Sequence, residues 1–173
     1  MRPAAEDPET AAALSAHQAS GIRWLAGGAM TVVLGVLLGA AALALVGDGR
    51  RLPGAGLVVI LLVLGGAAAS VAGAGALLRT LRWRRALRGT PWRTGWLRIA
   101  GPAVIAFEPE GYDELSDEPV RMRLLTTAVW RTRAVQRLAD AEVSYAPVSA
   151  REWVFTADGV GTLFGARTAG RRG

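Results

Sequence analysis

The sequence predicts an α-helical hairpin that crosses a membrane twice, followed by a small and mainly β domain on the cytosolic side. Three observations lead to this prediction. Two long apolar runs carry no charged residue, an arginine-rich segment follows the second run directly, and the last part of the chain alternates short apolar segments with turn residues. We therefore expect a membrane anchor and one further domain.

The two apolar runs cover residues 25–46 and 57–78. A helix of about 22 residues is roughly 33 Å long, which exceeds a hydrocarbon core of about 30 Å. Buried helices of soluble proteins seldom run this far without a polar face. The first run is also longer than the apolar part of a cleaved signal peptide. We expect transmembrane helices at residues 24–46 and 57–78.

Small residues recur at four-residue spacing in both runs, as in helices that pack closely in lipid. They are expected to be helix-packing residues: Gly35, Gly39, Gly65, Ala69 and Gly73. Because the connecting loop at residues 47–56 is short, packing within a tight antiparallel hairpin is favoured over self-association between copies. Neither run contains an ionisable residue, which argues against a transporter or channel acting as a monomer.

The net charge of +6 and the pI near 11.3 come almost entirely from one segment. Residues 79–91 contain five arginines and no acidic residue, whereas residues 92–173 contain eleven arginines against ten acidic residues. A nucleic-acid partner is therefore not expected. Arginine collects on the cytoplasmic side of membrane helices. This basic juxtamembrane segment predicts that both termini of a bacterial inner-membrane protein lie in the cytoplasm.

In this topology residues 1–23 form a cytosolic tail and residues 47–56 a short external loop. Arginine heads meet anionic lipid headgroups while their stems lie along the acyl chains, and tryptophan favours the interface. The residues expected to contact anionic lipid are Arg23, Trp24, Arg79, Arg82, Trp83, Arg84, Arg85 and Arg88. Within the tail, Asp7 before Pro8 predicts the N-cap of a short helix at about residues 8–19. His17 is expected to be a solvated surface residue.

The β domain is expected at residues 92–168, with a disordered tail at residues 169–173. Short apolar segments between turn residues predict strands at residues 92–99, 103–107, 120–125, 142–146, 153–157 and 162–166. Asp158-Gly159 separates the last two as a hairpin, and residues 128–139 are a candidate helix. A domain of this size suggests an SH3-like or OB-like barrel or a sandwich. Its aromatic residues are assigned to the core rather than to a base-stacking surface: Trp92, Trp96, Phe107, Trp130, Trp153 and Phe155.

Catalytic and metal-binding patterns are scarce. The chain has no cysteine and a single histidine, which excludes thiol chemistry and sites built from several His or Cys ligands. The acidic residues between positions 108 and 118 lack the spacing of a calcium loop, so a solvated loop is expected. No phosphate-binding loop is present. We expect no enzyme activity and no cofactor.

The last half of the chain resembles uncharacterised two-span bacterial membrane proteins with a small β-rich cytosolic domain. The resemblance rests on the segments PWRTGWLRI, AVIAFEP, VRMRLL, AVWRTRAVQRL, AEVSYAP and REWVFTADGVGTLFGAR. Those proteins tend to carry glycine before the proline of the fifth segment, where this chain has Ala146-Pro147. The resemblance implies the architecture and no activity.

The expected function is that of a non-enzymatic membrane protein that presents its β domain as an interaction module. The expected partners are anionic lipid and a protein at the cytosolic face, with self-association as an option. The alternative is a membrane-tethered ligand sensor, or an accessory subunit of a membrane enzyme or secretion complex. A pocket with converging polar groups would favour the sensor.

Overall fold

The computed structural model describes residues 3–47, 53–101, 103–113, 118–125, 141–157 and 161–168. The chain divides into two compact units. One unit, residues Ser15–Thr80, is the hairpin. The other combines Met1–Leu14 with Leu81–Gly173, and it holds the β domain together with one end of each helix.

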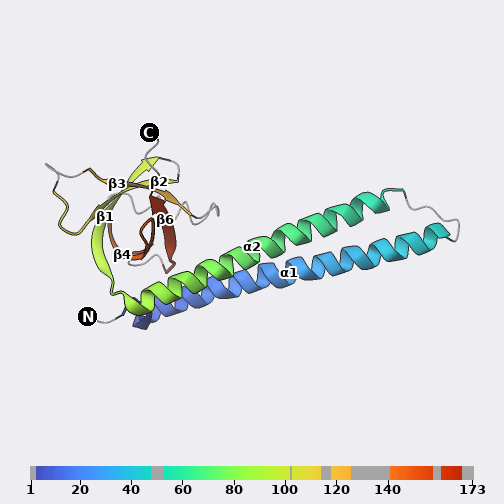
Figure 1. The fold of residues 1–173 in the computed structure, drawn as a ribbon, viewed down its shortest axis with the longest axis horizontal. Coiled ribbons are helices and arrows are strands. Elements are labelled where there is room, and N and C mark those ends of the chain that lie inside the picture. The colour runs from blue at the N-terminus through green and yellow to red at the C-terminus, as the bar shows by residue number, and fades with distance from the viewer. Residues whose placement is uncertain are drawn as a thin grey trace. The chain divides into compact units, whose positions relative to one another are not determined.

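Two long helices form the hairpin and run antiparallel beside each other (Figure 1). Helix α1 spans Pro8–Gly47 and helix α2 spans Ala55–Gly89. The short N-terminal helix and the first membrane helix expected from the sequence are thus one continuous helix. Helix α2 likewise continues through the arginine-rich segment, and Thr90-Pro91 follows its end. Both helices are long and apolar enough to cross a membrane.

The start of α1 is capped as the sequence predicts. A carboxylate oxygen of Asp7 accepts hydrogen bonds from the backbone N–H of Thr10 at 2.9 Å and from its hydroxyl at 2.7 Å. The Thr10 hydroxyl in turn accepts a hydrogen bond from the indole N–H of Trp92 at 3.2 Å. A short 3-10 helix, Ala4–Glu6, precedes the cap, and the Ala4 N–H donates to the Thr90 carbonyl at 3.0 Å. The first described residues are therefore fixed at Ala4 to the segment that follows α2.

Replacing Asp7 with alanine is expected to destabilise this unit by about 1 kcal/mol, the usual cost of losing an N-cap. The hydrogen bond from the Thr10 side chain lowers the pKa of Asp7 below its ordinary value near 3.8. Since the pKa is depressed in the folded state, the contribution is complete above about pH 4 and is lost as pH falls through the folded pKa. Urea titrations of wild type and Asp7→Ala at falling pH measure it. If the difference in unfolding free energy between the two proteins stayed constant as the pH fell below the folded pKa of Asp7, Asp7 would not be the N-cap.

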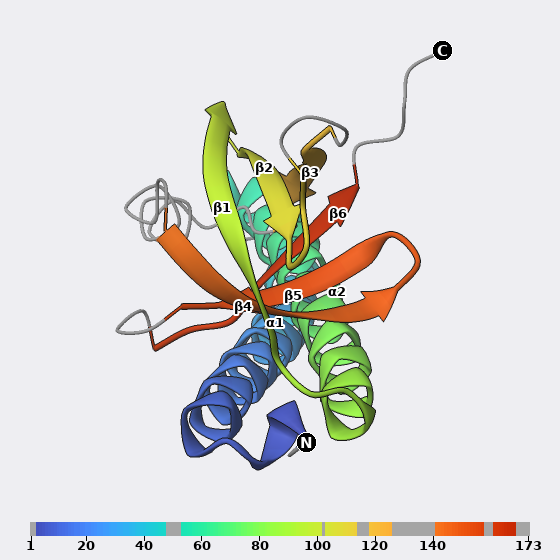
Figure 2. The ribbon, with the colours of Figure 1, turned by 90° about the vertical axis from the view of Figure 1, so that its left-hand side faces the viewer.

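Six antiparallel strands form a closed barrel in the order β1-β2-β3-β6-β5-β4, with β4 pairing β1 (Figure 2). They are β1 Arg93–Gly101, β2 Val104–Pro109, β3 Val120–Leu124, β4 Ala141–Ser149, β5 Glu152–Thr156 and β6 Phe164–Thr168. All six predicted strands are confirmed, and the barrel decides between the two architectures expected. The β5–β6 hairpin is confirmed by its register. The candidate helix at residues 128–139, Trp130, the Asp158-Gly159 turn and the tail at residues 169–173 lie outside the described residues.

The barrel interior is filled by side chains from alternate positions of every strand. Phe107 packs edge-on against Tyr145 and Phe155, with ring centroids 4.8 and 5.0 Å away. A Cβ at Gly95 would lie 2.7 Å from the Phe107 ring, so only glycine leaves room for that ring. Phe107, Phe155 and Trp153 belong to the core as predicted, and Phe164 completes the aromatic row.

The prediction that Trp96 is a core residue is wrong, because its side chain is 54% exposed. It points outward with Thr94 and Arg98, whereas the alternate positions of β1 point inward. Trp92 is partly buried and packs elsewhere, against a second apolar cluster on the outside of the barrel. Of the five described aromatic residues among the six assigned to the core, those on β2 and β5 line the interior.

This outer cluster joins the barrel to the ends of both helices. All of its residues belong to the unit that contains the barrel. Its buried members are Ala4, Ala13, Leu14, Trp83, Leu87, Ala146, Val154 and Leu163. Ala146 and Val154 are cross-strand neighbours on β4 and β5. They point away from the barrel interior, so other residues must shield them from solvent. Residues at the ends of the two helices do so, and the described N-terminal residues are therefore part of the packing of the β domain.

Candidate functional site

The hairpin is held by glycines that bring the two helix backbones into contact. A Cβ at Gly28 would lie 2.6 Å from the Gly66 carbonyl oxygen, and a Cβ at Gly66 would lie 2.7 Å from the Gly28 carbonyl oxygen. A Cβ at Gly73 would meet the backbone nitrogen of Leu25. Gly35 faces Leu62 and Val63 across the interface. Close backbone approach of this kind is how small residues pack helices in lipid.

The predicted helix-packing residues divide into two groups. Gly35, Gly39 and Gly73 lie against the opposite helix. Gly65 meets nothing within 4 Å, and with Ala69 it lines an open groove of about 340 Å³ beside the interface. The contact is made one residue further along, at Gly66. The seven-residue spacing of Gly66 and Gly73, and of the α1 glycines at positions 21, 28 and 35, was the available signal for this helix pair.

The arginine-rich segment presents its charges on the exposed side of α2. Arg79, Arg82, Arg85 and Arg88 are exposed, and Arg84 is partly buried. The apparent scatter of these arginines around the helix has a simple cause. Trp83 and Leu87, four residues apart and therefore on one face, are buried against the barrel, and the arginines occupy the other positions.

The prediction that Trp83 contacts lipid headgroups is contradicted by its position. Its side chain is only 3% exposed and its indole N–H donates to a carboxylate oxygen of Glu152 at 3.0 Å. The other carboxylate oxygen of Glu152 lies 3.5 Å from a guanidinium nitrogen of Arg167. A Cβ at Gly165 would lie 2.6 Å from the Trp83 ring, so the indole fits against β6 because residue 165 has no side chain. Trp83 therefore fixes the end of α2 to β5 and β6.

Arg23 and Trp24 are both exposed on α1, as an interfacial pair requires, and Trp24 is 61% exposed. His17 was expected to be solvated, but it is 8% exposed and belongs to the buried face of α1. Among the described residues no group of three or more His, Asp, Glu or Cys side chains is arranged to hold a metal ion.

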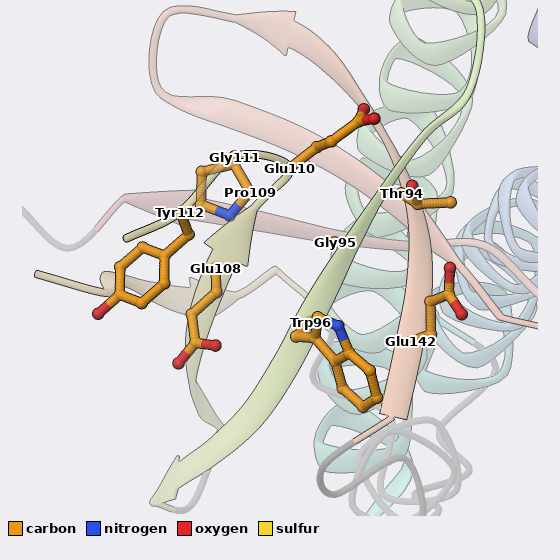
Figure 3. Close-up of a pocket in the computed structure, with 9 residues that line it drawn as sticks. All are labelled: Thr94, Gly95, Trp96, Glu108, Pro109, Glu110, Gly111, Tyr112 and Glu142. Carbon is orange, nitrogen blue, oxygen red and sulfur yellow. The ribbon is translucent and has the colours of Figure 1, made fainter. Parts of the chain in front are cut away.

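A pocket of about 370 Å³ lies on the outer side of the barrel (Figure 3). Its walls come from β1, β2, β4 and the turn after β2, and they are formed by Thr94, Gly95, Trp96, Glu108, Pro109, Glu110, Gly111, Tyr112 and Glu142. Trp96 lies directly across from Glu108 on one neighbouring strand and from Glu142 on the other. Glu108 is paired with Arg98 at 3.1 Å. The described lining of the pocket thus combines aromatic and acidic groups.

Comparison of the chain with protein-family models, with curated proteins and with solved structures finds no match.

Proposed function

We propose that this chain is an integral protein of the bacterial inner membrane, and that it presents the barrel to the cytosol as a non-enzymatic interaction module. The observation that carries the proposal is the exposure of the two apolar helix segments, of which only 6% is buried in each case. A core helix of a soluble protein would be covered by the rest of its fold. An apolar surface of this size requires lipid or a partner.

The orientation follows from the arginines. Four exposed arginines follow the second apolar run on α2, and Arg23 precedes the first run on α1. The opposite loop holds Arg50 and Arg51 beside Asp48. This difference favours a cytosolic location for the end of the hairpin that carries the barrel.

The exposed Trp96 supports the role of the barrel in binding. A tryptophan on the outside of a barrel loses apolar contact with its own chain, and tryptophan is enriched where proteins meet their partners. The same pocket favours the second candidate function, a membrane-tethered ligand sensor. An aromatic ring beside the exposed carboxylate of Glu142 suits a small organic cation or a basic side chain.

Affinity capture from gently solubilised membranes tests the proposal. The wild-type protein is expected to co-purify with a defined partner, and Trp96→Ala is expected to lose that partner while remaining in the membrane fraction. Thr94→Ala, on the same face of β1, serves as a control for the loss of a smaller side chain. A protein that is monomeric and alone under several mild conditions would contradict the interaction module. Binding of a small cation by the purified protein would favour the sensor instead.

A further inference from the structure

We propose that a second basic surface, on the barrel itself, docks on the anionic headgroups of the leaflet from which α2 emerges. This surface, called the β3–β6 arginine face below, consists of Arg121, Arg123 and Arg167. It rests on the proposed function, since it requires the hairpin to be inserted in a membrane.

The three arginines point to the same side because of strand alternation and register. Met122 and Leu124 of β3 are buried in the interior, so Arg121 and Arg123 point outward and are exposed. Arg123 lies directly across from Arg167 of β6. The Arg167 side chain is 56% exposed. Two neighbouring strands (Figure 2) thus place three guanidinium groups on one patch of the outer wall.

The pairing of Arg123 with Arg167 points to an anionic ligand. Like charges directly opposite each other destabilise a sheet. Arg167 is balanced on its other side by Glu152, but that carboxylate is 6% exposed and also accepts the Trp83 indole N–H. Within the described residues no ion pair is recorded for Arg121 or Arg123. Phosphate groups would satisfy these side chains, because guanidinium binds phosphate through two parallel hydrogen bonds.

The link through Trp83 joins this face to the arginine-rich end of α2. Trp83 contacts Glu152, Glu152 pairs with Arg167, and the sequence neighbours of Trp83 are Arg82 and Arg84. The arginine-rich end of α2 and the β3–β6 arginine face therefore belong to one packed unit. A barrel tethered in this way is held within reach of the headgroups, and each basic residue near an anionic leaflet adds attraction.

Arginine modification tests the docking on the intact chain. The protein is reconstituted in vesicles of zwitterionic lipid or of zwitterionic lipid mixed with phosphatidylglycerol, and treated with phenylglyoxal, which reacts with guanidinium groups. Mass spectrometry then gives the rate at each arginine. Modification of Arg121, Arg123 and Arg167 is expected to slow about fivefold in the anionic vesicles. Arg93, exposed on β1 and three strands away from β6 in the barrel order, is the internal control and is expected to react equally in both.

Two variants that each remove one positive charge test whether the protection depends on the β3–β6 arginine face. Arg123→Gln is expected to reduce the protection of Arg121 and Arg167, whereas Arg93→Gln is expected to leave it unchanged. Equal rates in the two kinds of vesicle would overturn the docking, and the proposed membrane insertion would still stand if the protein remained in the vesicles. Equal protection by inorganic phosphate added to zwitterionic vesicles would also overturn it, because the ligand would then be a free anion.

Discussion

Replacing Trp83 with alanine is expected to lower the free energy of unfolding of the barrel unit by about 3–5 kcal/mol. The substitution removes the largest side chain of the outer cluster and leaves a cavity over Gly165. It also removes the N–H that donates to Glu152, a carboxylate that is 6% exposed. The loss is large because a folded domain is stable by only about 5–15 kcal/mol. Pulse proteolysis of the full chain in mild detergent and urea measures it.

Trp96 provides a matched control, because it is the same residue type on the same barrel and is 54% exposed. Trp96→Ala is expected to change the unfolding free energy by about 0.5 kcal/mol or less. Trp83→Phe keeps most of the packing and removes only the hydrogen bond to a charged group, so about 1.5–3 kcal/mol is expected. Similar urea midpoints for Trp83→Ala and Trp96→Ala would show that the end of α2 is not fixed to the barrel.

Replacing Gly66 with valine is expected to separate the two helices of the hairpin. A Cβ at this position would lie 2.7 Å from the Gly28 carbonyl oxygen and 2.9 Å from the Val32 backbone nitrogen. Backbone atoms cannot turn aside as a flexible side chain can, so the helices must move apart. Overpacking of this kind costs about 1–3 kcal/mol.

The rate of disulfide formation between two introduced cysteines reports how closely the helices pack. Such a pair can be introduced without competing thiols, because the chain has no cysteine of its own. A Cβ at position 39 would lie 3.3 Å from a methyl carbon of Val59, so cysteines at Gly39 and Val59 are within bonding reach. In this background Gly66→Val is expected to slow disulfide formation about tenfold. Gly65→Val is the control, since a Cβ there meets nothing within 4 Å. Equal rates in the two variants would contradict the assigned interface.

Most of the fold was predictable because its signals are local. The alternation of Val120, Met122 and Leu124 with two arginines predicts β3, and the Asp7-Pro8 pair predicts the start of α1. The outward position of Trp96 was also predictable from the sequence, since Trp96 alternates with Leu97 and lies on the same side of the strand as Arg98. The alternation along β1 determines the outward position of Trp96, although tryptophan is a large and largely apolar side chain.

The errors concern contacts between distant parts of the chain. Trp83 lies among arginines at the end of an apolar run, where an interfacial tryptophan is common. Its partner Glu152 is 69 residues away, and no local pattern connects the two. In α2, rows starting at Gly65 and at Gly66 both show small residues at four-residue spacing. The crossing geometry of the helices decides which row is buried, and four-residue spacing alone does not specify it, whereas the seven-residue spacing of Gly66 and Gly73 does indicate it.

The central claim is that the hairpin spans the membrane with the barrel on the cytosolic side. Single cysteines replacing Pro53, in the loop between the helices, and Ala150, in the exposed β4–β5 turn, test it directly. Intact bacterial cells with the outer membrane permeabilised are treated with a maleimide that cannot cross the inner membrane. We predict labelling of Pro53→Cys without lysis and of Ala150→Cys only after lysis. Labelling of Ala150→Cys in intact cells, or of neither cysteine until lysis, would contradict the account.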